Sequence, residues 1–135
     1  MPATKSPGKT ARPAKAAGRF RIKRIYEPAG KDDGLRVLVD RLWPRGVAKR
    51  KAHIDLWLRD LSPSDKLRRE LHADPTKWEE FVKAYGRELK QEPARTALAE
   101  LRKLPRSQPV TLLYAARDEV HNNAVALKRW LGRAK

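Results

Sequence analysis

The sequence predicts an α/β fold, and three observations lead to this prediction. Two short apolar runs, residues 37–39 and 110–114, have the β-branched and aliphatic composition of strands buried on both faces. Between and after them, apolar residues recur at helical spacing. The chain has 135 residues and no cysteine, and this length can bury one core without disulfides. We therefore expect a two- or three-layer sandwich with a short, mainly parallel, Rossmann-like sheet and about four helices.

The amino-terminal segment differs in composition from the rest of the chain. Residues 1–19 are rich in alanine, lysine, proline and glycine, and they have no large apolar side chain beyond Met1. Such a segment cannot bury enough surface to offset its chain entropy. We expect residues 1–19 to be a disordered basic tail and residues 20–135 to form a single α/β domain.

The formal net charge of +16 predicts an attraction to polyanions. The tail carries five basic residues and no acid, so nonspecific binding of nucleic acid through the tail is one expectation. A solvated surface without a partner explains the same charge. No apolar run approaches the roughly 20 residues that cross a bilayer, and the amino terminus lacks the apolar segment of a secretory signal. We expect a cytoplasmic protein that does not associate with membranes, and the sequence leaves its oligomeric state open.

The first strand is expected within residues 20–26, where a break in alternation indicates an edge or bulged strand. Residues 28–34 form a turn cluster ahead of the buried strand at residues 37–39. The two strands either pair as an antiparallel hairpin or are joined by an irregular crossover. Residues 54–58 suit a strand or a short helix equally well.

Three helices are expected between the two buried strands. Ser62 is predicted to cap the first helix, with Pro63 at its first position. Asp74 and Pro75 repeat this signal before the second helix. The apolar stripe of the second helix could be imagined as a base-stacking surface, but its spacing is that of a buried face. Its members are Trp78, Phe81, Val82, Tyr85 and Leu89. A third helix begins near Pro93, and a last one opens after the strand at residues 110–114.

Polar groups follow both buried strands, where ligands bind in open α/β sheets. Residues 40–46 should form an ordered loop, because Pro44 disfavours a helix and Gly46 permits an unusual backbone angle. We expect Asp40 and Asp118 to be catalytic groups, and the other candidates to bind a ligand. The ligand-binding candidates are Arg41, Trp43, Arg45, Gly46, Tyr114 and Asn122. If the two strands are parallel neighbours, these loops lie side by side.

Each of these residues also has a structural interpretation. Asp40 and Arg41 could pair with each other, Trp43 could close the edge of the core, and Asp118 could cap the last helix. His53 and His72 have no partner at metal-ligand spacing, so no metal site and no cofactor is predicted.

Three motifs give the chain a family resemblance, and together they extend it from about residue 22 to residue 131. They are Asp-Arg-Leu-Trp-Pro-Arg-Gly at residues 40–46, Ser-Pro-Ser at residues 62–64, and Thr-Leu-Leu-Tyr-Ala-Ala at residues 111–116. With these motifs the chain resembles the YeaO-like branch of the domain of unknown function 488 family. The resemblance implies a small bacterial cytosolic α/β protein without an established activity. The family pattern carries Asn-His at the start of the last helix, so Asn122 matches it, Asn123 departs from it, and His121 stands just before the two.

Two functional classes remain open from the sequence. The first is a protein that binds or acts on an anionic small molecule, phosphorylated or nucleotide-like, at the strand ends. The second is a DNA-binding or regulatory protein, since the helices near residues 64–72 and 76–90 resemble a helix-turn-helix. Acidic residues along the second of these helices would repel phosphate.

Overall fold

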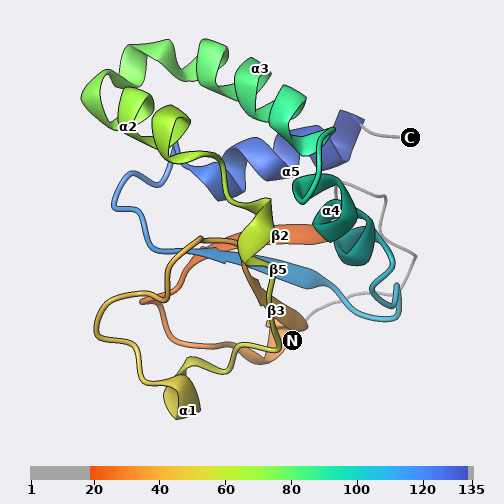
Figure 1. Ribbon diagram of the computed structural model, residues 1–135. Coiled ribbons are helices and arrows are strands. Elements are labelled where there is room, and N and C mark those ends of the chain that lie inside the picture. Colours follow the sequence, from red (N-terminus) through yellow and green to blue (C-terminus); the bar gives the residue numbers. More distant parts are fainter. Residues whose placement is uncertain (1–18, 134–135) are drawn as a thin grey trace.

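The computed structural model describes residues 19–133 and shows a four-stranded parallel sheet (Figure 1). The strands are β2 (Phe20–Arg24), β3 (Leu35–Leu38), β4 (Leu56–Trp57) and β5 (Val110–Tyr114), in the order β2-β5-β3-β4. Both β2 and β3 pair with β5 in parallel register. The predictions of an α/β fold and of parallel buried neighbours are confirmed, and β2 is an edge strand. The segment between β2 and β3 is an irregular crossover, because the two strands do not pair with each other.

Four of the described α-helices have nine or more residues: α2 (Asp65–Ala73), α3 (Trp78–Leu89), α4 (Ala94–Arg102) and α5 (Asn123–Arg133). Figure 1 shows these helices on one side of the sheet, while the short α1 (Lys49–Ala52) lies on the other side among loops. Short 3-10 helices, η1 (Lys31–Asp33), η2 (Arg59–Leu61) and η3 (Pro75–Lys77), join these elements. None of the described helices is both long and apolar enough to cross a membrane.

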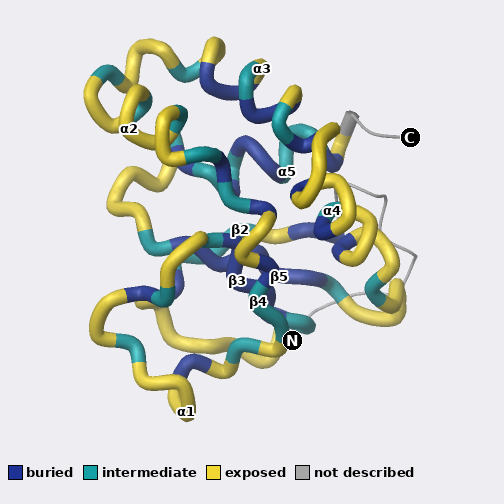
Figure 2. The backbone as a smooth tube through the Cα atoms, in the orientation of Figure 1, coloured by how far each residue is buried: buried dark blue, intermediate teal, exposed yellow. Residues whose placement is uncertain are grey.

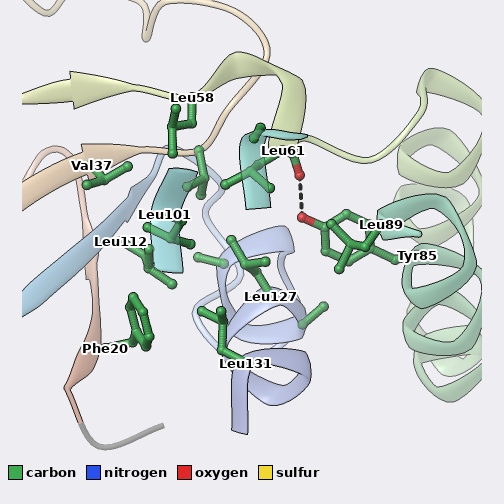
Figure 3. Packing of buried hydrophobic residues seen from close by; sticks show 14 of the residues in the cluster. Phe20, Val37, Leu58, Leu61, Tyr85, Leu89, Leu101, Leu112, Leu127 and Leu131 are labelled. Atoms are coloured by element: carbon green, nitrogen blue, oxygen red, sulfur yellow. Dashed lines mark hydrogen bonds between the residues drawn. The ribbon is translucent and has the colours of Figure 1, made fainter. Parts of the chain in front are cut away.

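The larger apolar cluster fills the space between the sheet and the helices (Figures 2 and 3). Alternate residues of β5, Val110, Leu112 and Tyr114, belong to this cluster, as side-chain alternation along a strand requires. The expected stripe of α3 also lies in this cluster, with Trp78 only partly buried, so its interpretation as core is confirmed. The Tyr85 hydroxyl donates to the Leu61 carbonyl, which ties α3 to η2 (Figure 3).

The opposite face of the sheet is covered by loops. Its apolar cluster consists of Ile25, Leu38 and Leu113, and the side chains packed over it include two tryptophans, Trp43 and Trp57. The two indole rings meet edge to face, with their centroids 5.5 Å apart. Aromatic rings thus close a face that helices would cover in a three-layer sandwich.

Buried charge at Asp33 holds the loops on this face. The Asp33 carboxylate accepts bonds from Lys23 Nζ at 2.9 Å and from Arg36 Nη1 at 2.5 Å. The Asp33 carbonyl accepts a bond from the buried Thr111 hydroxyl at 2.7 Å. Burial alone would raise the pKa of Asp33, but bonds from Gly30 N–H, Lys23 and Arg36 outweigh it and lower the pKa.

Arg19 does not lie in a solvated tail. It is 3% exposed, and its guanidinium donates to the carbonyls of Leu104 and Pro105, both at 3.0 Å. Its own carbonyl accepts a bond from Val110 N–H at 2.9 Å, so it extends the pairing between β2 and β5. The remainder of the expected tail, residues 1–18, lies outside the described residues.

Two local predictions are corrected or decided by the structure. Ser64, not Ser62, caps α2, because its hydroxyl accepts a bond from Leu67 N–H at 3.3 Å. The Ser62 hydroxyl instead bonds the Arg59 carbonyl at 2.9 Å. Residues 54–58 contain the short strand β4, which pairs with β3, so the strand alternative is correct for this segment.

Gly86 provides a stability test of the contact between α3 and α5. A Cβ atom at this position would overlap the indole ring of Trp130, which lies on α5. Replacing glycine by alanine in a helix stabilises by roughly 1 kcal/mol on propensity, whereas overpacking a core costs about 1–3 kcal/mol. We therefore expect Gly86→Ala to lower the free energy of unfolding in a denaturant titration.

The matched control is the same substitution in a Trp130→Leu background, where the ring is gone. There Gly86→Ala should be neutral or stabilising. An equal loss in both backgrounds would contradict the packing argument.

Candidate functional site

The carboxyl ends of β2, β5 and β3 meet at one edge of the parallel sheet, and Asp40 lies at this edge. One Asp40 oxygen accepts a bond from Ala115 N–H at 3.0 Å, and the other accepts a bond from Asn123 Nδ2 at 2.9 Å. Asn123 Nδ2 also lies 3.1 Å from the Val39 carbonyl. Asp40 therefore joins the loop after β3 to the loop after β5 and to the first residue of α5.

The Asp40 carboxyl has a perturbed pKa. Burial raises it, and the bonds from Asn123 and Ala115 and the nearby charge of Arg68 offset this effect only in part. A carboxyl with a raised pKa among loops at the strand ends is typical of a functional site, although structural groups show the same shift.

The loop at residues 40–46 is ordered, as the sequence predicted. Trp57 Nε1 donates to the Asp40 carbonyl at 2.7 Å, and Trp43 Nε1 donates to the Val47 carbonyl at 2.6 Å. Gly46 has a φ of +78°, the unusual backbone angle expected at this position. Trp43 is half-buried against the loop-side cluster, so closing the core edge is one role that it fulfils.

Arginine side chains surround this loop. Arg41 is exposed and its Nη1 lies 3.6 Å from an Asp65 oxygen, so its ion-pair partner is Asp65 and not Asp40. Arg45 is also exposed, and the Tyr26 hydroxyl donates to its carbonyl at 2.8 Å. Within residues 19–133 the Arg45 guanidinium has no hydrogen bond or ion pair.

Two residues that sequence reasoning did not select complete this edge. The Arg24 guanidinium lies over the Tyr26 ring, 4.7 Å from its centroid, and Arg24 Nε donates to the Ala116 carbonyl at 2.9 Å. These contacts connect the end of β2 to the segment after β5. The bond from the Tyr26 hydroxyl to the Arg45 carbonyl connects it to the loop at residues 40–46 as well. We call Arg24, Tyr26 and Arg45 the Tyr26 cluster. The signal for it was the strand order, since Arg24 ends a strand that neighbours β5 and Tyr26 follows that strand.

The remaining candidates lie at the end of β5 and in the segment that leads to α5, and they make structural contacts. One Asp118 oxygen accepts bonds from Val120 N–H at 2.9 Å and His121 N–H at 2.8 Å, and the His121 and Val120 bonds lower the pKa of Asp118. Asn122 is 2% exposed, donates to the Asp118 carbonyl and accepts from Val125 N–H, so it caps α5. Tyr114 is buried, and this burial raises its pKa.

Asn123, rather than His121, is the residue that contacts Asp40. The His121 ring packs against Trp78 with the centroids 5.0 Å apart, and its Nδ1 lies 3.6 Å from an Asp118 oxygen. Sequence reasoning selected Asn122 and left Asn123 out of the site, although the family pattern places a histidine at position 123. That pattern was the signal that could have identified the partner of Asp40.

Comparison with known proteins identifies relatives over almost the whole described chain. The model of a family described as the inactive DUF488-N3 subclade matches residues 19–135. The uncharacterised protein YeaO of Escherichia coli K12 is 42% identical over 113 residues, which cover 83% of this chain and 96% of that protein. The uncharacterised proteins Mb3100c of Mycobacterium bovis and Rv3073c of Mycobacterium tuberculosis are each 41% identical, covering 84% of this chain and 93% of their own. No solved structure matches the chain.

The raised pKa of Asp40 predicts a pH dependence of stability. Because the folded-state pKa is above the unfolded value, the contribution of this carboxyl is fully present below about pH 3.9 and is lost as the pH rises through the raised pKa. Thermal melts of the parent and of Asp40→Asn should therefore diverge in favour of the variant as the pH rises from acid to neutral. Asp33, whose pKa is lowered, is common to both proteins and cancels from the difference. A difference in melting temperature that stays constant across this range would contradict the prediction.

Loss of the Asn123 amide should destabilise the protein. Asn123→Ala removes a donor from the Asp40 carboxylate and from the Val39 carbonyl, and unsatisfied buried groups cost about 1–3 kcal/mol each. We expect a loss in this range by denaturant titration, together with a further rise in the Asp40 pKa followed by NMR. Lys128→Ala, on the same helix, should change stability by less than about 0.5 kcal/mol. If the two variants lose equal stability, the bonds from Asn123 to Asp40 and Val39 do not stabilise the fold.

Proposed function

The chain belongs to the YeaO-like branch of the domain of unknown function 488 family, in the subclade described as inactive, and we propose that it binds a small phosphorylated or nucleotide-like molecule without transforming it. The binding site is the carboxyl edge of the sheet. The observation that carries the proposal is the exposed Arg45 guanidinium, which is unpaired within residues 19–133 and belongs to a loop whose backbone is fixed.

The Tyr26 cluster supports an anionic ligand with an aromatic part. A guanidinium offers paired donors that match the geometry of a phosphate, and a fixed backbone reduces the entropy lost on binding. Tyr26 is 45% exposed; the Arg24 guanidinium lies over its ring, and its hydroxyl donates to the Arg45 carbonyl. An exposed ring beside arginines suits a nucleobase, which stacks on aromatic faces.

Binding without catalysis is supported by the environment of the two carboxylates. Both oxygens of Asp40 accept bonds from Ala115 and Asn123, and Asp118 is bonded to the backbone of its own turn. A general base needs an oxygen within reach of the proton that it removes. The family description points the same way. The catalytic roles of Asp40 and Asp118 stay predictions, and we propose that Asp40 positions the loops instead.

The regulatory alternative gains no specific support from α2, η3 and α3. The apolar face of α3 is buried in the core, and Glu79, on its exposed side, pairs with Arg129 at 2.8 Å. A groove of about 560 Å³ between α2 and α3 is lined by both acidic and basic side chains, including Glu80, Glu88 and Arg87. A recognition helix needs a face free of carboxylates to approach phosphates.

Arg45 provides the test of the binding site. Arg45→Lys keeps the charge but loses the paired donors, so it should weaken binding of adenosine monophosphate about tenfold in calorimetry, the loss of roughly 1.4 kcal/mol. Its stability should stay within about 0.5 kcal/mol of the parent, because the side chain is exposed. Inorganic phosphate, tested in parallel, measures the phosphate contribution without the base.

The matched control is Arg50→Lys, an equal change at an exposed position of α1. It should leave both affinities unchanged. Failure of the parent to bind either probe, or equal affinity of the parent and Arg45→Lys, would overturn the proposed site.

A further inference from the structure

We propose that the amino-terminal edge of the sheet carries a second anion-binding surface, formed by Arg102, Lys103 and Arg106, which contacts the phosphate backbone of nucleic acid. We call these three residues the α4-end patch. The proposal goes beyond the tail as a source of nonspecific affinity, because it assigns part of the contact to the folded body. It is independent of the ligand site at the carboxyl edge.

The patch lies where the described chain begins. Helix α4 ends at Arg102, and the connection that follows it leads to Val110, the first residue of β5. Arg19 donates to the Leu104 and Pro105 carbonyls within this connection, and Val110 N–H bonds the Arg19 carbonyl. Arg19, the first residue that the structure describes, therefore lies beside the α4-end patch.

No carboxylate of residues 19–133 pairs with the patch. Arg102, Lys103 and Arg106 are exposed, and none of them forms an ion pair with a carboxylate within residues 19–133. The sequence contains no acidic residue between Glu100 and Asp118. Burial first and the nearby positive charge of Arg106 second lower the pKa of Arg19.

The sequence ahead of Arg19 continues this charge. It contains Lys5, Lys9, Arg12 and Lys15 and no acidic residue. A run of cations of one sign releases condensed counterions when it follows a polyphosphate backbone. The guanidinium of Arg19 itself is committed to two carbonyls and supplies no phosphate contact.

Nucleic acid fits this surface better than an anionic membrane does. Basic surfaces that dock on membranes insert apolar side chains beside the charges. The large apolar side chains exposed in the described part of the chain are Tyr26, Leu42 and Val120, and each follows a strand at the carboxyl edge. The five-residue strands β2 and β5 separate that edge from the patch by about 15 Å.

The experiment measures binding of the full chain to a short fluorescent DNA duplex of arbitrary sequence over a range of sodium chloride concentrations. The patch variant is Arg102→Gln with Lys103→Gln and Arg106→Gln. The matched control removes three exposed charges from α2 and α3: Lys66→Gln with Arg69→Gln and Lys83→Gln. A third variant replaces the four basic residues ahead of Arg19 with glutamine.

Each phosphate contact contributes roughly −0.9 to the slope of log affinity against log salt. The magnitude of this slope should therefore fall by about 2.7 in the patch variant, which loses three phosphate contacts. In the control variant it should fall by less than about 0.9, the contribution of one contact. The tail variant should still bind DNA with a salt-dependent affinity. Adding the patch substitutions to the tail variant should abolish this binding. Thermal melts will verify that the variants fold.

Equal losses in the patch variant and the control would show that only net charge matters, and would overturn the proposal. An unchanged slope in the patch variant would overturn it as well. Patch-dependent binding to phosphatidylserine vesicles without binding to DNA would identify a membrane surface and reject nucleic acid. Because the adenosine monophosphate assay probes Arg45, failure of either site leaves the other unaffected.

Discussion

The Asp40 carboxylate is the junction on which the carboxyl edge of the sheet depends. It accepts two hydrogen bonds, one from Ala115 N–H after β5 and one from the side-chain amide of Asn123 at the start of α5. The backbone carbonyl of Asp40 accepts a third bond, from Trp57 Nε1. Since β3, β4, β5 and α5 all end or begin here, the loops between them are held in one arrangement. A charged group in this position costs desolvation, and this burial raises the pKa of Asp40. The result is a rigid frame from which the arginines project.

The sequence was sufficient for the parts of the fold that depend on local patterns. The uninterrupted apolar run at residues 37–39 is fully buried, and the α3 stripe lies in the core, because periodicity reports burial directly. The sequence was insufficient where two neighbouring residues could fill the same structural role. Ser62 and Ser64 flank the same proline, and only the path of the chain decides which hydroxyl reaches the free N–H of Leu67.

The candidate site shows the same division between local and distant information. The ordered loop at residues 40–46 followed from Pro44 and Gly46, whose backbone restrictions are local. The choice of Asn123 over Asn122 as the partner of Asp40 depends on how α5 packs on the sheet, which the helix's own sequence does not contain. Arg19 was assigned to the tail by composition, yet it is buried and bonds to Val110, a residue far along the chain.

The position of β5 in the sheet determines when this protein can fold. Phe20 of β2 and Leu35 of β3 both pair with Val110 of β5. The strand that joins β2 to β3 is therefore made only when the chain is almost complete. Contacts between β3 and the short β4 are the exception, since they join nearby segments. Closing such distant pairings is slow, and the unpaired strands stay exposed meanwhile. During synthesis, β2 and β3 therefore cannot complete their pairing in the sheet until Val110–Tyr114 has been made.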